Sequence, residues 1–467
     1  MKTTFGVIVG NRGFFPDSLA EQGRQEILRV LEQNGYGAVC LNPGQTEFGT
    51  VETREDAKKC AALFTENADR IDGIIITLPN FGDERAAAES IRLADLGVPV
   101  LVQASPDDPE RMDASGRRDS FCGKISVCSN LNQYGIPFTL TSRHTVSLDS
   151  EEFAGDLARF AAVCRVVAGM GSARVGAIGT RPAAFNTVRY SEKILEAHGI
   201  AVEPVDLSEI LAGARALEDD DRRVVEKADA IRAYGGTEPE AEPHVVKMAR
   251  LGVVLDDFIR ENELDACAIQ CWQSLEQNFG VVPCTLMSMM SNALVPSACE
   301  VDVGGALAMY ALQLASGTPS ALLDWNNNYG DDPDRCVCFH CSNIAAHFME
   351  QPRVDYQTIL AQAVGKECTY GTFVGRIRQG ATTFARIMTD DTLGMIRAYT
   401  GQGEFTDERL ETFGGYGVLH VERLQGLMQY ICTNGFEHHV AVSLSRCADV
   451  LEEAFANYLG YQTYRHR

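Results

Sequence analysis

Apolar positions in the first third of the chain follow two alternating spacings. Short apolar runs at residues 4–13, 71–79 and 98–106 are typical of buried strands, and the segments between them repeat apolar residues at helical spacing. Strands and helices that alternate over short connections indicate right-handed βαβ units and a parallel sheet. The pattern therefore predicts an N-terminal flavodoxin-like α/β domain over residues 1–145.

The same alternation restarts with a long helix near residues 150–171 and the strand 173–182. It continues to about Gly317, which predicts a second flavodoxin- or Rossmann-like α/β domain over residues 146–317. Short strands with many asparagines and glycines follow, so a β-rich C-terminal domain is predicted over residues 318–467.

Composition narrows the class of protein. A chain of 467 residues, 45% apolar and 22% charged, is typical of a multidomain globular protein. The net charge of −23 argues against nucleic acid and anionic membrane as partners, although it permits a small anionic substrate. The first apolar run is too short for a signal peptide. The 15 cysteines are odd in number and scattered, so we expect reduced thiols and a cytoplasmic protein.

Two motifs resemble cofactor-binding sequences but do not match the patterns that such sites require. The glycines of "GMGSARVG", residues 169–176, follow a helix and precede a strand, the reverse of the order that a dinucleotide fingerprint requires. The run "CVCFHC", residues 336–341, has no second Cys/His pair at zinc-finger spacing, and a strand would point its side chains to opposite faces. We predict a buried strand there. His340 remains a candidate site residue independently of the cysteines.

Carboxylates lie at the ends of predicted strands in the second half. In "PSACEVDVGGALAMYAL", residues 296–312, Glu300 and Asp302 precede a run that can only be a buried helix, and Asp324 ends the apolar strand "SALLDW". Such positions are where α/β proteins bind ligands. Helix capping for Glu300 and an Asx turn for Asp324 are equally good explanations of each residue taken singly.

Adjacent histidines, His438 and His439, open a late strand of alternating type. Taken alone, such a pair is more often structural than a ligand. Two carboxylates and one imidazole nevertheless form a familiar set for a divalent ion of the manganese kind. Spacing alone leaves open whether the three segments meet.

Together these segments resemble the L-fucose and L-arabinose isomerase superfamily along the whole chain. The most specific matches are residues 298–312, residues 322–341 and the histidine pair. The resemblance implies aldose–ketose isomerisation through a cis-enediol, at a divalent metal that is typically manganese. The implied ligands are Glu300, Asp324 and His439, with His438 as the competing choice.

The resemblance also implies roles around the sugar. Glu300 and Asp324 would exchange roles as base and acid, and His340 would bind the metal or a substrate hydroxyl. Members are commonly hexamers, in which a neighbouring subunit supplies an arginine to the site. The implied substrate contacts are Arg12 for that arginine, and Gln270, Trp272, Gln273 and His438.

The sequence does not identify which sugar is the substrate. The chain is shorter than typical fucose isomerases, and "WNNNYGDD", residues 325–332, differs from the corresponding loop of either enzyme. A sugar like L-fucose or L-arabinose is the default, and a hexose modified at C6, such as sulfoquinovose, is the other possibility. Arg376 and Arg378 are either surface charges or anion-binding groups. The alternative function is a cytoplasmic sugar-binding or sensor module without catalysis; a dehydrogenase is disfavoured because the dinucleotide fingerprint is absent.

Overall fold

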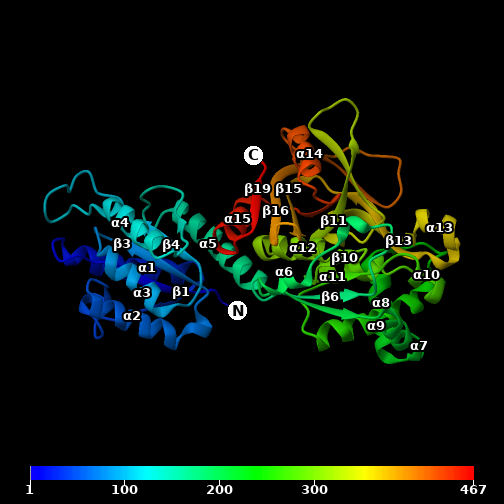
Figure 1. Cartoon of the computed structure of the whole chain (residues 1–467), viewed down its shortest axis with the longest axis horizontal. Coiled ribbons are helices and arrows are strands. Elements are labelled where there is room, and N and C mark those ends of the chain that lie inside the picture. Colours follow the sequence, from blue (N-terminus) through cyan, green and yellow to red (C-terminus); the bar gives the residue numbers. More distant parts are fainter. Residues whose placement is uncertain (1) are drawn as a thin grey trace. The chain divides into compact units, whose positions relative to one another are not determined.

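A computed structural model describes residues 2–467 (Figure 1). The chain divides into two compact units, Met1–Ala168 and Gly169–Arg467. Three sheets run along it, two parallel and one large and mixed, so the predicted order of α/β architecture followed by β-rich architecture is confirmed. Among the described residues, no helix has both the length and the apolar character needed to cross a membrane.

The first unit is a doubly wound α/β domain. Its five strands are all parallel and follow the order β2-β1-β3-β4-β5, which is the flavodoxin order. One face of the sheet packs on α2, α3 and α4, and the other on α1 and α5. The elements are β1 (Thr4–Val9), α1 (Asp17–Gln33), β2 (Gly37–Cys40), α2 (Arg54–Glu66), β3 (Gly73–Leu78), α3 (Glu84–Ala94), β4 (Val100–Ala104), α4 (Ser120–Gln133), β5 (Thr139–Leu140) and α5 (Glu151–Met170).

The second unit begins with a smaller parallel sheet of order β10-β9-β6-β7. Helix α5 ends at Met170 and β6 starts at Arg174, so Gly171 follows a helix and precedes a strand, as the sequence pattern predicts. The elements are β6 (Arg174–Ile178), α6 (Glu192–Glu196), β7 (Ala201–Val205), α7 (Leu207–Ala216), α8 (Arg222–Tyr234), α9 (Val245–Glu261), β9 (Ala266–Ile269), α10 (Ser274–Phe279), α11 (Cys284–Asn292) and β10 (Ser297–Cys299).

A ten-stranded mixed sheet forms the β-rich part of the second unit, in the order β19-β16-β15-β18-β11-β12-β17-β14-β13-β8. The cysteine-rich run is strand β12, as predicted, whereas β11 continues four residues beyond Asp324. The elements are β8 (Gly236–Thr237), β11 (Ser320–Asn328), β12 (Arg335–His340), β13 (Met349–Tyr356), α13 (Thr358–Val364), β14 (Tyr370–Ile377), β15 (Gly380–Asp390), β16 (Met395–Phe405), β17 (Gly415–His420), α14 (Leu424–Thr433), β18 (His439–Ser443), α15 (Ala448–Glu453) and β19 (Gln462–Arg465).

Helix α12 (Val303–Ser316) lies between the two sheets of the second unit. It packs against β15, β18 and β11 of the large sheet and against β9 and β10 of the small one. A helix that is apolar on all sides is stable only when it is buried on all sides, which confirms the expectation from the sequence. The turn before α12 therefore lies where the two sheets meet.

Candidate active site

The turn from β10 into α12 positions two buried carboxylates. Asp302 caps the helix, and its carboxylate accepts a hydrogen bond from the Gly305 amide at 2.9 Å. Glu300 and Val301 both have left-handed backbone angles, with φ of 57° and 56°. This conformation is costly for residues other than glycine, above all for a β-branched valine, and such strain gathers at functional sites.

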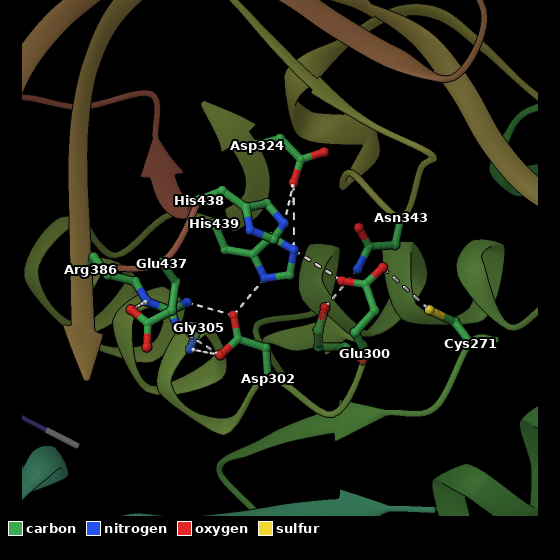
Figure 2. Close-up of polar contacts among 11 residues, drawn as sticks. Cys271, Glu300, Asp302, Gly305, Asp324, Asn343, Arg386, Glu437, His438 and His439 are labelled. Carbon is green, nitrogen blue, oxygen red and sulfur yellow. Dashed lines mark hydrogen bonds and ion pairs between the residues drawn. The ribbon is translucent and has the colours of Figure 1, made fainter. Parts of the chain in front are cut away.

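The three segments singled out in the sequence converge beyond this turn (Figure 2). Strands β11 and β18 pair antiparallel, with Asp324 directly opposite His439. The His439 Nε2 atom lies 2.9 Å from Glu300 Oε2 and 3.5 Å from Asp324 Oδ1. The structure thus brings together the three residues that the resemblance implies as metal ligands.

His439 is held in place from its other side. The ring is buried, and its Nδ1 lies 2.7 Å from Asp302 Oδ2. Burial disfavours the imidazolium, but the contacts with Asp302 and Glu300 outweigh it and raise the pKa of His439 to about 10. The acidic surroundings that keep a proton on this ring would also attract a divalent cation.

Asp302 is itself anchored by a buried ion-pair network. Arg386 on β15 contacts both of its oxygens, at 2.5 and 2.9 Å, and also donates to Glu437 Oε2 at 3.0 Å. Burial alone would raise the pKa of Asp302, but Arg386 and His439 hold it well below its usual range. A Cβ at Gly304 would lie 2.5 Å from Ile387 O, so glycine permits the close approach of β15.

The sequence interpretation missed this network. The sequence pattern identifies Asp302 only as a carboxylate before a buried helix, and it does not single out Arg386 and Glu437. One signal was available, because an arginine in the apolar strand segment "TTFARIM" must find a buried partner.

The two remaining histidines differ in exposure. His340 is buried, and Asp324, His340 and His439 each offer a ligand atom within 4.8 Å of the others. The His438 side chain is 43% exposed, and its Nε2 lies 3.6 Å from Asp324 Oδ1. Burial lowers the pKa of His438 to about 4, so this ring is neutral near pH 7. The geometry favours His439 over His438 as the ligand.

The candidate sugar contacts on the segment after β9 have different surroundings. Gln270 accepts from the Thr180 amide at 2.9 Å and donates to Trp272 O at 3.1 Å, so its amide holds two loops together. Trp272 meets Phe185 edge-on at 5.5 Å, and Phe185 lies 6.4 Å from His438. Gln273 is exposed. Of these side chains, Trp272 belongs to an aromatic group that reaches the histidine pair.

Each arginine candidate has partners within its own unit. Arg12 is in the first unit, where it stacks on Phe81 at 4.2 Å and pairs with Glu84. Arg376 pairs with Glu350 Oε2 at 2.5 Å, and Arg378 donates to Met349 O at 3.3 Å. Arg376 and Arg378, together with Arg409 and Tyr416, line a cavity of about 520 Å³.

The donor set fits a hard divalent cation. Carboxylate oxygens and imidazole nitrogens are the ligands that such ions share, and they converge here in a largely buried acidic cluster. Glu300 Oε2 is buried and lies 2.9 Å from His439 Nε2. A divalent cation that both atoms ligate would displace the proton between them.

Glu276 on α10 is a further residue that sequence reasoning missed. It is fully buried, and within residues 2–467 neither of its carboxyl oxygens has a hydrogen-bond partner. Burial raises its pKa to about 8, and the nearby Cys341 contributes in the same direction. Glu276 is therefore protonated near pH 7.

Replacing Glu276 should change how stability depends on pH. Because the folded state raises this pKa from 4.5 to about 8, its stabilising contribution is complete below pH 4.5 and is lost as the pH rises toward 8. The slope for one proton is about 1.4 kcal/mol per pH unit. Glu276→Gln should remove that slope between pH 5 and 8. Urea unfolding followed by tryptophan fluorescence measures it, because Trp272 and Trp325 both lie in the second unit.

The matched control for this prediction is Glu261→Gln on the exposed surface of α9. That variant should keep the wild-type pH profile. Parallel profiles for wild type and Glu276→Gln would show that the buried carboxyl ionises as it does in the unfolded chain.

Comparison with known proteins gives two family matches. Residues 6–171 match the family described as fucose/sulfoquinovose isomerase, N-terminal domain, and residues 338–466 match L-fucose isomerase, C-terminal domain. The chain belongs to the L-fucose isomerase-like family. Members are aldose–ketose isomerases, so the chain is an enzyme that interconverts an aldose sugar and a ketose.

The relatives of this L-fucose isomerase-like enzyme include several sulfoquinovose isomerases. That of Priestia aryabhattai is 24% identical over 340 residues, which cover 73% of this chain and 72% of the relative. That of Alkalicoccus urumqiensis is 26% identical over 247 residues, or 52% and 54% of the two chains. The fucose isomerase family is generally metal-dependent, in agreement with the candidate ligand groups. Glu300 and Asp324 lie between the two matched ranges, so their assignment depends on the geometry.

Proposed function

We propose that this enzyme is a manganese-dependent isomerase for a C6-modified aldohexose of the sulfoquinovose kind. The observation that carries the metal assignment is the meeting of Glu300, Asp324 and His439 around His439 Nε2. The curated relatives named sulfoquinovose isomerase support the substrate class over L-fucose or L-arabinose. A sugar-binding module without catalysis would have no need of this buried set.

The residues present account for the proton transfers. A cation held by Glu300, Asp324 and His439 would supply Lewis-acid polarisation of the sugar carbonyl. One carboxylate removes the proton from C2 of the aldose, protonation of O1 then gives a cis-enediol, and a carboxylic acid returns a proton to C1 as the ketose forms. A second proton moves from O2 to O1, so the product is an isomer. Burial raises the pKa of Asp324, which favours its role as a base.

The surrounding residues position these groups. Asp302 fixes the His439 ring so that Nε2 faces Glu300 and Asp324. Trp272, near Phe185 and His438, provides an apolar wall on which a sugar face would pack. His340 contacts a substrate hydroxyl or serves as a further ligand.

We also propose a homo-oligomer, a hexamer by resemblance to the family, that works in the cytoplasm. In such an assembly Arg12 would complete the site of a neighbouring subunit. The small-molecule partner is then the sugar alone. Support for this part comes from the family resemblance and from the acidic composition.

The test is ketose formation followed by NMR. Protein stripped with EDTA and refilled with Mn²⁺ is incubated separately with sulfoquinovose, L-fucose, L-arabinose and D-arabinose. We expect conversion of sulfoquinovose only after the metal is returned. Conversion of L-fucose or L-arabinose instead would overturn the substrate, and equal rates in EDTA-treated protein would overturn the metal dependence.

A further inference from the structure

Four buried cysteines line the inner side of the active site. Cys271 follows β9, Cys284 begins α11, Cys299 ends β10 and Cys341 follows β12. Cys271 Sγ lies 3.9 Å from Glu300 Oε1. Soft sulfur atoms thus lie directly against the hard oxygen ligands of the site.

Cys341 comes closest to the metal-binding groups. Its Sγ lies 3.7 Å from His340 Nδ1. Glu300, His340 and Cys341 each offer a ligand atom within 4.8 Å of the others, and all three residues are buried. His340 therefore belongs to two groups, one completed by Asp324 and His439 and the other by Glu300 and Cys341.

The spacing of the second group suits a tetrahedral thiophilic ion. Zinc bonds of about 2.3 Å to sulfur and 2.0–2.1 Å to nitrogen place those two atoms about 3.6 Å apart at a tetrahedral angle. The observed separation of 3.7 Å agrees with this value. Thiolate and imidazole ligands suit zinc, whereas oxygen ligands suit manganese.

We propose that Cys341, His340 and Glu300 form a binding site for zinc-class cations that overlaps the catalytic metal set. When the ion binds, the Cys341 thiol gives its proton to the buffer as the metal–sulfur bond forms. Because Glu300 and His340 are shared, a zinc-class ion in this site draws Glu300 away from His439. Binding of the zinc-class ion does not depend on the proposed substrate. Any loss of turnover that the bound ion causes rests on the proposed function.

Cobalt(II) is the spectroscopic probe for this site. Full-length protein stripped with EDTA is titrated with Co²⁺, and thiolate-to-cobalt charge transfer is recorded in the near ultraviolet. We expect one saturating equivalent with this absorption in the wild type and its loss in Cys341→Ser. Zinc should displace the cobalt and abolish the absorption, and zinc affinity should fall by about tenfold or more in Cys341→Ser.

Cys447→Ser is the matched control, because Cys447 is also buried but contacts Ser445 rather than a candidate ligand. It should keep the full charge-transfer signal. Cys341→Ala replaces Cys341→Ser if the serine variant fails to fold. No charge transfer in the wild type, or an undiminished signal in a folded Cys341 variant, overturns the proposal. Failure of sugar conversion with the signal intact would count against the proposed function alone.

Discussion

Glu300→Gln should lower the rate of ketose formation by about 10²–10⁴-fold, the usual scale for loss of general base catalysis. Glutamine has nearly the same shape but accepts no proton, and it places a neutral amide where Glu300 Oε2 lies 2.9 Å from His439 Nε2. The variant should stay folded, since removal of one buried carboxylate relieves repulsion from Asp324. Initial rates by NMR at saturating Mn²⁺ and urea midpoints by fluorescence provide the two measurements.

Metal analysis separates the two roles of Glu300. Bound manganese at the wild-type level with lost turnover would assign Glu300 to proton transfer, and reduced manganese would add a role as ligand. Glu261→Gln, an exposed exchange of the same kind, should match the wild type in both measurements. Turnover at the wild-type rate in Glu300→Gln would contradict the assignment of this site.

Arg386→Met should destabilise the second unit by about 3–5 kcal/mol, the usual cost of leaving a buried charge without its partner. Arg386 is almost fully buried, and it neutralises the buried carboxylates of Asp302 and Glu437. Methionine fills most of the volume, so the loss is electrostatic rather than a cavity. The urea midpoint reported by Trp272 and Trp325 fluorescence measures the change.

Two further variants isolate the cause of that loss. Glu437→Gln added to Arg386→Met should restore part of the stability, because it removes one of the two uncompensated charges. Arg260→Met breaks an exposed ion pair with Asp257 and should cost no more than about 1 kcal/mol. An Arg386→Met midpoint equal to that of Arg260→Met would show that the buried network contributes little.

At the proposed site, the network would also link stability to catalysis. Arg386 holds Asp302, and Asp302 holds the Nδ1 side of His439. A histidine ligand that donates its second nitrogen to a carboxylate has a fixed tautomer and orientation. The same contacts that make the fold sensitive to Arg386 therefore point Nε2 at Glu300 and Asp324.

Periodicity in the sequence was enough to predict the elements around the site. The apolar run after Asp302 is a buried helix and "CVCFHC" forms a strand through His340, as expected; of the histidine pair, His439 opens a strand and His438 precedes it. These features follow from the spacing of apolar residues within a single segment of the chain. The end of β11 was the exception, because pairing with β12 extends the strand beyond Asp324 to asparagines with no strand signal of their own.

Residue type and position single out the candidate ligands in the sequence, but only the family resemblance implies that they meet at one metal. Glu300 and His439 are far apart in the chain, and nothing in their local patterns requires them to meet. Their contact follows from the pairing of β11 with β18 and from the left-handed turn at Glu300 and Val301. Both are consequences of how the two sheets of the second unit enclose α12.

The sequence by itself determined the α/β and β-rich architectures, the burial of α12 and the residue types available for chemistry, because these follow from the order and spacing of apolar residues. Tertiary structure alone decided that Arg386 neutralises Asp302, that Glu276 is buried without a partner, and that Cys341 lies beside His340 and Glu300. Those facts depend on contacts between distant segments. Because a buried charge is costly unless it is paired, burial decides which charged groups need a partner.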